Sequence, residues 1–253
     1  MTTSRQRGPR ASFLGLDFDL VDESSAIRTV LDFSQSARFS YVVTPNVDHM
    51  VRLLRGEDTR LASAYDRAAL CLCDSRILSA MAGLSSIKLP VVTGSDLTAR
   101  LLSPPRAFRG AAVIGGDEKL MSALRARYPD VAWVHHEAPP RILYNAKAQL
   151  EVASFVENCP STIFFFAIGS PQSELICALI DGRERASGVG LCIGASLEFL
   201  VGAKRRAPRW LQKIGLEWLF RLAREPARLW RRYLVHGPTI FWHWTRWLVR
   251  SPR

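Results

Sequence analysis

The sequence has few cysteines, and their positions fit neither a metal site nor a disulfide framework. Five occur among 253 residues: Cys71, Cys73, Cys159, Cys177 and Cys192. None has the paired spacing of a zinc site, and Cys71 and Cys73 fall inside an apolar run that is typical of a buried strand. We therefore expect reduced thiols and a cytoplasmic protein.

Long apolar runs are also absent. No stretch reaches the ~18 uninterrupted apolar residues of a membrane-spanning helix. The first ten residues, MTTSRQRGPR, lack the apolar core of a secretion signal, and we expect residues 1–10 to be disordered. Both absences favour a cytoplasmic chain whose contact with a membrane, if it makes one, is peripheral.

Net charge is absent from the first four-fifths of the chain. Residues 1–202 contain 21 basic and 21 acidic residues, whereas residues 203–253 contain 13 basic and 2 acidic residues. The second segment therefore carries the whole net charge of +11, together with six of the seven tryptophans. This change in composition predicts a boundary near residue 202, between a domain at 11–202 and a basic, tryptophan-rich helical appendage at 203–253.

Six short apolar runs recur through the first domain. They are 41–43 (YVV), 70–73 (LCLC), 111–114 (AAVI), 131–134 (VAWV), 163–168 (IFFFAI) and 189–193 (VGLCI). Helical patterns such as 117–128 and 146–156 lie between them. Because the runs are continuously apolar rather than alternating, both faces of the sheet should be covered. The sequence predicts an α/β protein with a doubly wound, mainly parallel sheet.

Several of these runs end in small or polar residues. The loops are 44–46 (TPN), 74–75 (DS), 115–116 (GG), 169–171 (GSP) and 194–196 (GAS). In an open α/β sheet, ligands bind in the crevice beyond the carboxyl ends of the strands. Each loop also precedes a predicted helix, whose free N–H groups are suited to phosphate. We expect the binding site along this edge.

Individual residues of these loops have two interpretations. Thr44 and Asn46 suit the cap of a helix, and at the same time they suit a site at a strand end. Asp74 likewise fits a helix cap or a general base that faces the crevice. Asp17 and Asp19 form the D-x-D pattern that holds a metal in many sugar-nucleotide transferases, but the alternating residues around them favour a half-buried strand. The glycine pairs lack the full dinucleotide fingerprint, which disfavours an oxidoreductase.

The basic appendage should consist of helices separated at prolines. Pro208 suits an early helical position, Pro226 should restart a helix, and 237–238 (GP) should break it again. A mild break at Pro226 would bring the arginines of 221–232 to one face. The segment 239–249, with three tryptophans, is too short to span a membrane and has a composition that suits the headgroup boundary.

Three interpretations of the charged appendage remain open: a solvated basic face, binding to nucleic acid, and attachment to anionic lipid. A concentrated positive charge attracts the phosphates of nucleic acid without sequence preference. Tryptophan beside a short apolar segment favours lipid, because a bilayer rewards apolar insertion and positive charge together. We therefore expect an anionic membrane surface, and no nucleic acid, as the partner.

An ordered series of motifs is more specific than any single one. It comprises 44–49 (TPNVDH), Asp74, 93–97 (TGSDL), 169–174 (GSPQSE), 194–199 (GASLEF), 206–210 (RAPRW), 215–218 (GLEW), 221–222 (RL), 225–226 (EP) and 231–233 (RRY). In these motifs the chain resembles the WecG/TagA/CpsF family of bacterial glycosyltransferases over about residues 12–235. The resemblance implies a Rossmann-like fold with a C-terminal helical appendage that helps complete the site at the membrane.

The resemblance also implies an activity. Members of the family are inverting, metal-independent enzymes that move a hexose derivative from a UDP-sugar to a polyprenyl-diphosphate-linked sugar, for cell-surface polysaccharides. On this resemblance no cofactor or metal is expected, and the protein should lie on the inner face of the plasma membrane. An exposed apolar face would support dimers or trimers, but the sequence does not count subunits. The alternative is a nonenzymatic module that binds membrane or nucleic acid through its basic tail.

Site residues follow from the matched motifs. Asp74 corresponds to the proposed base of the family, and Thr44 and Asn46 to the motif that orients substrate. The expected substrate-binding residues are Asp48, His49, Gly94, Asp96, Gly169, Pro171, Gln172, Glu174, Gly194, Glu198, Arg206, Arg221, Arg224, Arg228 and Arg231. The arginines would stabilise the negative charge of departing UDP or meet the diphosphate of the acceptor.

Three positions depart from the pattern of the family. Ser173 stands where the family commonly has Gln, Ser75 follows the base where Gly is frequent, and Glu198 stands where Asp is usual. These residues lie along the expected donor crevice. The donor sugar, a mannosamine derivative, glucose or glucosamine, is therefore not determined by the sequence.

Overall fold

A computed structural model of the chain describes residues 8–56 and 58–250. Most of the N-terminal segment that was expected to be disordered lies outside these residues, but Arg10 already begins a strand. The strands are β1 (Arg10–Phe13), β2 (Leu16–Asp19), β3 (Ser40–Val43), β4 (Leu70–Cys71), β5 (Gly110–Ile114), β6 (Ala132–His136), β7 (Ile163–Phe166) and β8 (Val189–Cys192).

Six of these strands form one parallel sheet in the order β4-β3-β8-β7-β5-β6. The chain steps outward from β3 to β4, crosses to β5 and β6 on the other side, and returns through β7 and β8 to lie beside β3. All six strands coincide with the apolar runs of the sequence, which confirms the predicted doubly wound α/β fold. The change of direction brings the ends of β3, β8 and β7 together, where such sheets bind ligands.

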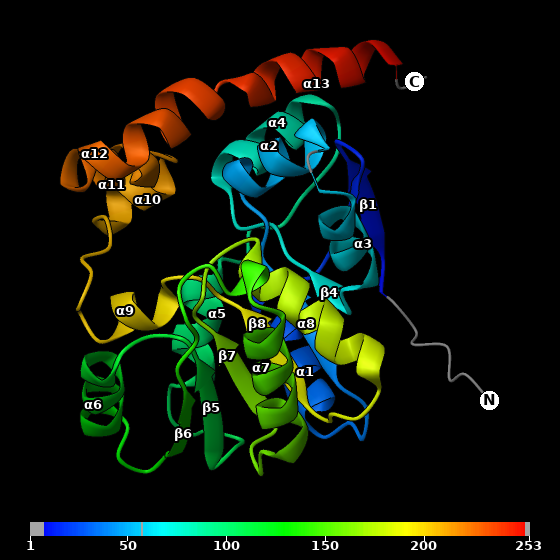
Figure 1. Cartoon of the computed structure of the whole chain (residues 1–253). Helices are drawn as coiled ribbons and strands as arrows, with labels where there is room; N and C mark the ends of the chain where they lie inside the picture. Colours follow the sequence, from blue (N-terminus) through cyan, green and yellow to red (C-terminus); the bar gives the residue numbers. More distant parts are fainter. Residues whose placement is uncertain (1–7, 57, 251–253) are drawn as a thin grey trace.

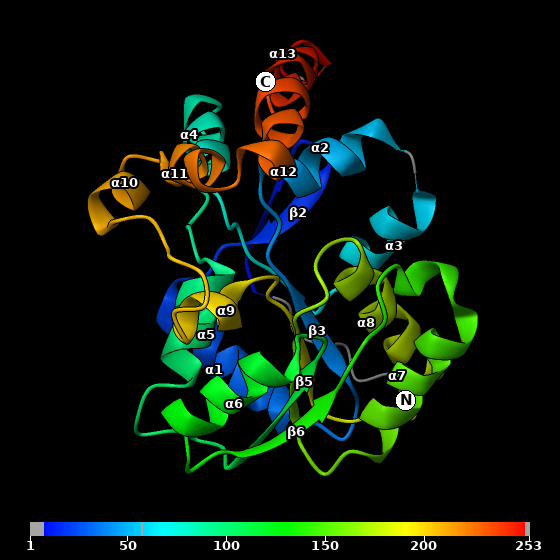
Figure 2. The ribbon, with the colours of Figure 1, turned by 60° about the vertical axis from the view of Figure 1, so that its left-hand side comes forward.

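Helices cover both faces of this sheet (Figure 1, Figure 2). In the body of the protein they are α1 (Glu23–Ser34), α2 (Val47–Arg55), α3 (Thr59–Arg67), α4 (Arg76–Leu84), α5 (Gly94–Leu101), α6 (Glu118–Arg127), the short 3-10 helix η1 (Ile142–Tyr144), α7 (Ala146–Asn158), α8 (Gln172–Arg183) and α9 (Ser196–Leu200). Helices α1, α5, α6 and α9 pack on one face, and α2, α3, α7 and α8 contribute to the core on the other.

Successive residues of a strand enter different cores. On β7, Ile163 and Phe165 pack with the core that α1, α5 and α6 cover, whereas Phe164 and Phe166 pack with the opposite core. All four side chains are fully buried. Because side chains alternate across a strand, a run that is apolar at every position requires cover on both faces. This is the physical reason for the continuous apolar runs.

The two aspartates of the D-x-D pattern lie on a separate hairpin. Strands β1 and β2 pair antiparallel beside α3 and β4. Asp19 is buried, accepts a 2.7 Å hydrogen bond from the backbone N–H of Cys71, and lies 3.3 Å from the guanidinium of Arg10. Asp17 is exposed. The strand interpretation is confirmed, since Asp19 ties the hairpin to β4.

The C-terminal segment forms a helical arm over the carboxyl edge of the sheet (Figure 1). It comprises α10 (Arg209–Lys213), α11 (Glu217–Arg224), α12 (Pro226–Trp230), the π-helical turn η2 (Arg231–His236) and α13 (Thr239–Arg250). Pro208 and Pro226 begin helices as predicted. The expected break at 237–238 is present, since η2 ends at His236 and α13 begins at Thr239. Gly237 nevertheless keeps helical backbone angles and donates to the carbonyl of Arg232.

The arm is fixed to the body through α13. Ile240 is buried, the indole N–H of Trp244 donates to the hydroxyl of Ser85 at 2.9 Å, and Trp247 meets Phe13 edge to face at 5.4 Å between ring centres. Trp244 and Trp247, expected at a membrane boundary, instead pack on the body. In the part of the chain that the structure describes, none of the helices combines the length and the apolar character needed to cross a bilayer.

Candidate active site

A cavity of about 950 Å³ lies between the carboxyl edge of the sheet and the C-terminal arm. Its floor is formed by residues that follow β3, β4, β5, β7 and β8, and its roof by residues of α11, η2 and α13. The roof therefore comes from the segment that carries the whole net positive charge of the chain. A site built from both parts depends on the contact between them.

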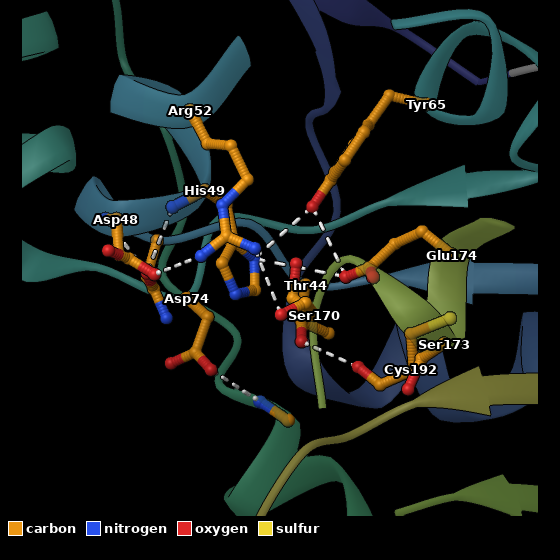
Figure 3. A network of polar contacts seen from close by, with 12 residues as sticks. Thr44, Asp48, His49, Arg52, Tyr65, Asp74, Ser170, Ser173, Glu174 and Cys192 are labelled. Atoms are coloured by element: carbon orange, nitrogen blue, oxygen red, sulfur yellow. Dashed lines mark hydrogen bonds and ion pairs between the residues drawn. The ribbon is translucent and has the colours of Figure 1, made fainter. Parts of the chain in front are cut away.

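Thr44, which Figure 3 shows, and Asn46 hold the centre of the floor in place. The hydroxyl of Thr44 donates to the backbone carbonyl of Cys192 at 3.1 Å, which links the ends of β3 and β8. The side-chain oxygen of Asn46 caps α2 by accepting from the N–H groups of Asp48 and His49. Both residues line the cavity, so the cap and the site are compatible interpretations.

Asp74 reaches the cavity just beyond β4. Its backbone N–H donates to the carbonyl of Pro45, and its carboxylate accepts from the N–H of Gly94 at 3.3 Å. Burial raises the pKa of Asp74 to about 7; the N–H of Gly94 opposes this shift, Glu217 adds to it, and Arg206 and Arg221 also oppose it. A carboxyl group with a pKa near 7 is well matched to accept a proton at neutral pH.

Gly94 itself lies behind the lining of the cavity. A Cβ at this position would lie 3.1 Å from the hydroxyl of Thr44 and 3.5 Å from that of Ser196. Glycine therefore lets the start of α5 approach β3 closely enough for its N–H to reach Asp74. The role expected for Gly94 as a substrate contact becomes, in the structure, a role in holding the floor together.

Arg206 connects the start of the arm to α5 and α11. Its guanidinium lies 2.6 Å from the carboxylate of Asp96 and 3.9 Å from that of Glu217. Burial alone would raise the pKa of Asp96, but hydrogen bonds from Arg206 and Thr93 hold it below its usual value. Asp96 is therefore an ionised partner of Arg206, and both line the cavity.

A cluster of three polar side chains, those of Tyr65, His49 and Glu174, lies beside the cavity (Figure 3). The hydroxyl of Tyr65 lies 3.3 Å from a carboxylate oxygen of Glu174 and 3.2 Å from Nδ1 of His49. Burial raises the pKa of Glu174 to about 7 and lowers the pKa of His49 to about 3. His49 is therefore a neutral ring at physiological pH. Tyr65 was missed by the sequence analysis because only the fold brings α3 to this position.

The arginines of the arm divide into two sets. Arg206, Arg221 and Arg228 line the cavity as expected. Arg224 and Arg231 are not among the described residues of the lining, and their guanidinium groups lie over the rings of Phe220 and Trp230. In a regular helix these two side chains would point about 60° and about 80° away from Arg221, whereas Arg228 would point only about 20° away.

Arg232 takes the place expected for Arg231. It lines the cavity and lies 3.4 Å from the carboxylate of Asp48. Asp48 also pairs with Arg52 one turn along α2, at 3.4 Å. Asp48 therefore holds the arm to the body at the rim of the cavity. The sequence contained two signals for Arg232: its place in the arginine series of 221–232 and its place in the 231–233 motif.

Some of the other expected residues line the cavity, and others lie behind the lining. Gly169, Gly194 and Glu198 line the cavity, and Glu198 pairs with Lys204 at 2.7 Å. Pro171 and Gln172 are not among the described residues of the lining and lie behind it at the start of α8. Residues that the sequence analysis did not select also line the cavity; they include Arg52, Arg76, Ser196, Glu217, Trp218 and Tyr233.

The fold and the cavity together define a class of protein. At the carboxyl edge of a doubly wound sheet, Asp74, whose pKa is about 7, shares a cavity with several arginines. This arrangement is suited to group transfer from a phosphate-bearing substrate. Comparison with known proteins gives the family. The model of the glycosyl transferase WecG/TagA/CpsF family matches residues 11–253, and the chain belongs to this family.

Curated relatives agree with this assignment. The chain is 23% identical over 224 residues to the N-acetylglucosaminyldiphosphoundecaprenol N-acetyl-beta-D-mannosaminyltransferase of Staphylococcus aureus strain MRSA252, with 86% of this chain and 85% of the relative covered. It is 23% identical over 234 residues to the protein of the same name from strain MW2, with 90% and 89% covered. The resemblance inferred from the motifs is confirmed, and the chain is a glycosyltransferase. The nonenzymatic alternative is wrong.

Proposed function

We propose that the protein transfers a hexose derivative, of the N-acetylmannosamine or glucose type, from a UDP-sugar to a polyprenyl-diphosphate-linked sugar in the synthesis of a cell-surface polysaccharide. The observation that carries this proposal is the meeting of Asp74 with Arg206, Arg221 and Arg228 across one cavity. The names of the Staphylococcus aureus relatives, which specify a lipid-diphosphate acceptor, support the acceptor class.

In the proposed reaction Asp74 acts as general base. Its carboxylate takes the proton of the acceptor hydroxyl while the hydroxyl oxygen forms a bond with the anomeric carbon of the donor. The bond from that carbon to the diphosphate oxygen breaks, and UDP leaves with the bonding electrons. A single displacement of this kind inverts the anomeric configuration.

The arginines of the roof would offset the charge that gathers on UDP. Guanidinium groups remain charged at all physiological pH values and bind phosphate oxygens through two parallel hydrogen bonds. Such preorganised charge is the usual alternative to a divalent cation for a departing diphosphate. Asp17 and Asp19, the sequence candidates for a metal, lie on the β1–β2 hairpin, outside the described lining of the cavity. We therefore propose that transfer needs no metal.

The test is an assay of purified protein with a panel of UDP-sugars and a short-chain lipid-diphosphate acceptor, in the presence of a chelator. We expect one donor to yield a glycosylated lipid at a rate that chelation leaves unchanged. Failure of every donor would contradict the proposed function. Strict dependence on Mg²⁺ or Mn²⁺ would contradict the metal-free mechanism alone and would direct attention back to Asp17 and Asp19.

The pH dependence of the reaction should report Asp74. Only the ionised form accepts a proton, so kcat/KM should rise about tenfold per pH unit below pH 7 and level off above it. Because Glu217 raises the pKa of Asp74, Glu217→Gln should move the midpoint to lower pH. The control Glu225→Gln changes a carboxylate on the same arm that pairs with Arg228. A midpoint that Glu217→Gln leaves in place would show that another group controls the profile.

The arm also supports our proposal of peripheral attachment to an anionic membrane. Trp242 and Val249 on α13 are 54% and 87% exposed, and the arm around them is basic. Amphipathic aromatic residues and positive charge together favour the headgroup region. Replacement of both by Asp should lower cosedimentation with anionic liposomes several-fold, and high salt should lower it for the unaltered chain. Unchanged binding of the Trp242→Asp/Val249→Asp variant would place the membrane contact elsewhere.

A further inference from the structure

The wall of the cavity changes in chemistry with distance from the sheet. Next to the sheet it combines polar and acidic residues such as Thr44 and Asp74 with apolar ones such as Ile168 and Ile193, and the arginines lie across from them. The part contributed by η2 and α13, which lie farthest from the sheet in Figure 1, is largely apolar. Its apolar lining, which we call the α4–α13 groove, consists of Ile77, Leu234, Ile240 and Phe241.

Two packed helices hold this groove in shape. Ile77 lies in the first turn of α4, three residues after Asp74, and so begins the apolar part directly beside the candidate base. Ile240 is 1% exposed and belongs to the core. The hydrogen bond from Trp244 to Ser85 fixes α13 against the far end of α4. Of α4, only the first turn, Arg76 and Ile77, is among the described residues of the lining, so the groove lies between this turn and the start of α13.

The groove opens to the surface at its outer end. Leu234 and Phe241 line the cavity, yet they are 56% and 51% exposed. Among the described residues that η2 and α13 contribute to the lining, none is acidic, and Arg232 is the nearest charge along the chain. An apolar mouth that continues an arginine-lined cavity indicates a ligand with a charged part and an apolar part.

We propose that the α4–α13 groove binds the first isoprene units of the acceptor's polyprenyl chain. This inference rests on the proposed function. A lipid-linked acceptor consists, in covalent order, of a sugar, a diphosphate and an apolar chain. The cavity presents a matching set of groups: the carboxylate of Asp74, the arginines Arg221, Arg228 and Arg232, and the apolar groove. The chain would leave between Leu234 and Phe241, on the arm that also exposes Trp242.

Binding of farnesyl diphosphate tests the groove without requiring turnover. By calorimetry, the unaltered protein should bind farnesyl diphosphate at least ~10-fold more tightly than inorganic diphosphate, because the groove buries isoprene surface. The Leu234→Ser/Phe241→Ser variant should bind the two ligands with about equal affinity. The control Val235→Ser/Leu248→Ser alters one residue of η2 and one of α13, with 50% and 42% exposure, that are not among the described residues of the lining, and it should keep the advantage.

Each outcome has a distinct meaning. Equal affinity of the unaltered protein for both ligands, or an advantage that survives in Leu234→Ser/Phe241→Ser, would overturn the inference. If a second copy of the chain fills the groove instead, the protein will be a dimer that the same double variant dissociates, with no preference for farnesyl diphosphate. Tight binding of farnesyl diphosphate without transfer from any UDP-sugar would leave the groove standing and overturn only the proposed function.

Turnover provides the second measurement. In detergent micelles, the kcat/KM of the unaltered protein should be higher for an acceptor with a polyprenyl chain than for the same sugar diphosphate with a methyl group. This ratio should fall about tenfold in Leu234→Ser/Phe241→Ser and should stay unchanged in the control Val235→Ser/Leu248→Ser. Equal ratios in the three proteins would contradict the proposal. Because all four replaced side chains are more than 40% exposed, the fold should tolerate both variants.

Discussion

Replacement of Asp74 by asparagine should lower kcat by at least ~100-fold, which is the usual contribution of a general base. Asparagine has nearly the same shape and can still accept the hydrogen bond that the N–H of Gly94 donates, so the floor of the cavity should keep its geometry. It cannot accept the proton of the acceptor hydroxyl. The measurement is steady-state transfer with saturating donor and acceptor.

Two controls separate this loss from a loss of structure. UDP affinity, measured by calorimetry, should change little in Asp74→Asn, because the diphosphate is expected to meet the arginines rather than this carboxylate. Asp58→Asn changes an aspartate that caps the start of α3 and is not among the described residues of the cavity lining, and it should leave transfer unchanged. A near-normal rate for Asp74→Asn would remove Asp74 from the role of base.

Replacement of Arg221 by alanine should lower kcat by about 100-fold, the scale found when one preorganised group that stabilises developing negative charge is lost. Arg221 lines the cavity from α11, and its charge acts on Asp74. If it faces the departing diphosphate, its loss raises the barrier for breaking the bond to UDP. The measurement is kcat for the unaltered protein and for Arg221→Ala, with the donor saturating in both.

Arg224 supplies the matched control. It lies on the same helix, three residues from Arg221, but its guanidinium lies over the ring of Phe220 rather than in the cavity. Arg224→Ala removes the same charge from the same arm and should leave kcat within about twofold of the unaltered protein. Equal losses in both variants would indicate a general effect of the basic arm and contradict a specific role for Arg221.

The sheet was predictable because its signal is local. The run at 163–168, for example, is apolar at every position, and such a run requires cover on both faces wherever it lies. The position of Asp74 followed from the same reasoning, since a polar residue directly after a buried strand must lie at the carboxyl edge. The motifs of the chain then supplied the family, which the match over residues 11–253 confirmed.

The roof of the cavity was only partly predictable, because its geometry depends on how the arm winds. In a regular helix through 221–232, Arg221, Arg228 and Arg232 would point within about 40° of one another, whereas Arg231 would point about 80° away from Arg221. In the structure Arg232 lines the cavity and Arg231 lies over the ring of Trp230. The sequence prediction treated all the arginines of 221–232 as one face, which was too broad.

The tryptophans of α13 show a similar limit. Composition alone assigned Trp242, Trp244 and Trp247 to one membrane-facing segment. Only the fold distinguishes Trp242, which is 54% exposed, from Trp244 and Trp247, which pack on Ser85 and Phe13. The distinction depends on β1 and α4, which are far away in the sequence. Removal of the whole of α13 would also remove the contacts of Trp244 and Trp247 with the body, so replacement of the exposed Trp242 and Val249 is the more specific test of membrane attachment.

The account is tested most directly by the product of the complete reaction. Protein, the preferred UDP-sugar and a lipid-diphosphate acceptor are incubated in chelator, and the lipid is analysed by mass spectrometry and NMR. The account predicts one added sugar per acceptor, an inverted anomeric configuration, and UDP released in an equal amount. Release of UDP without a glycosylated lipid, or a product that retains the donor's anomeric configuration, would contradict direct transfer with Asp74 as the base.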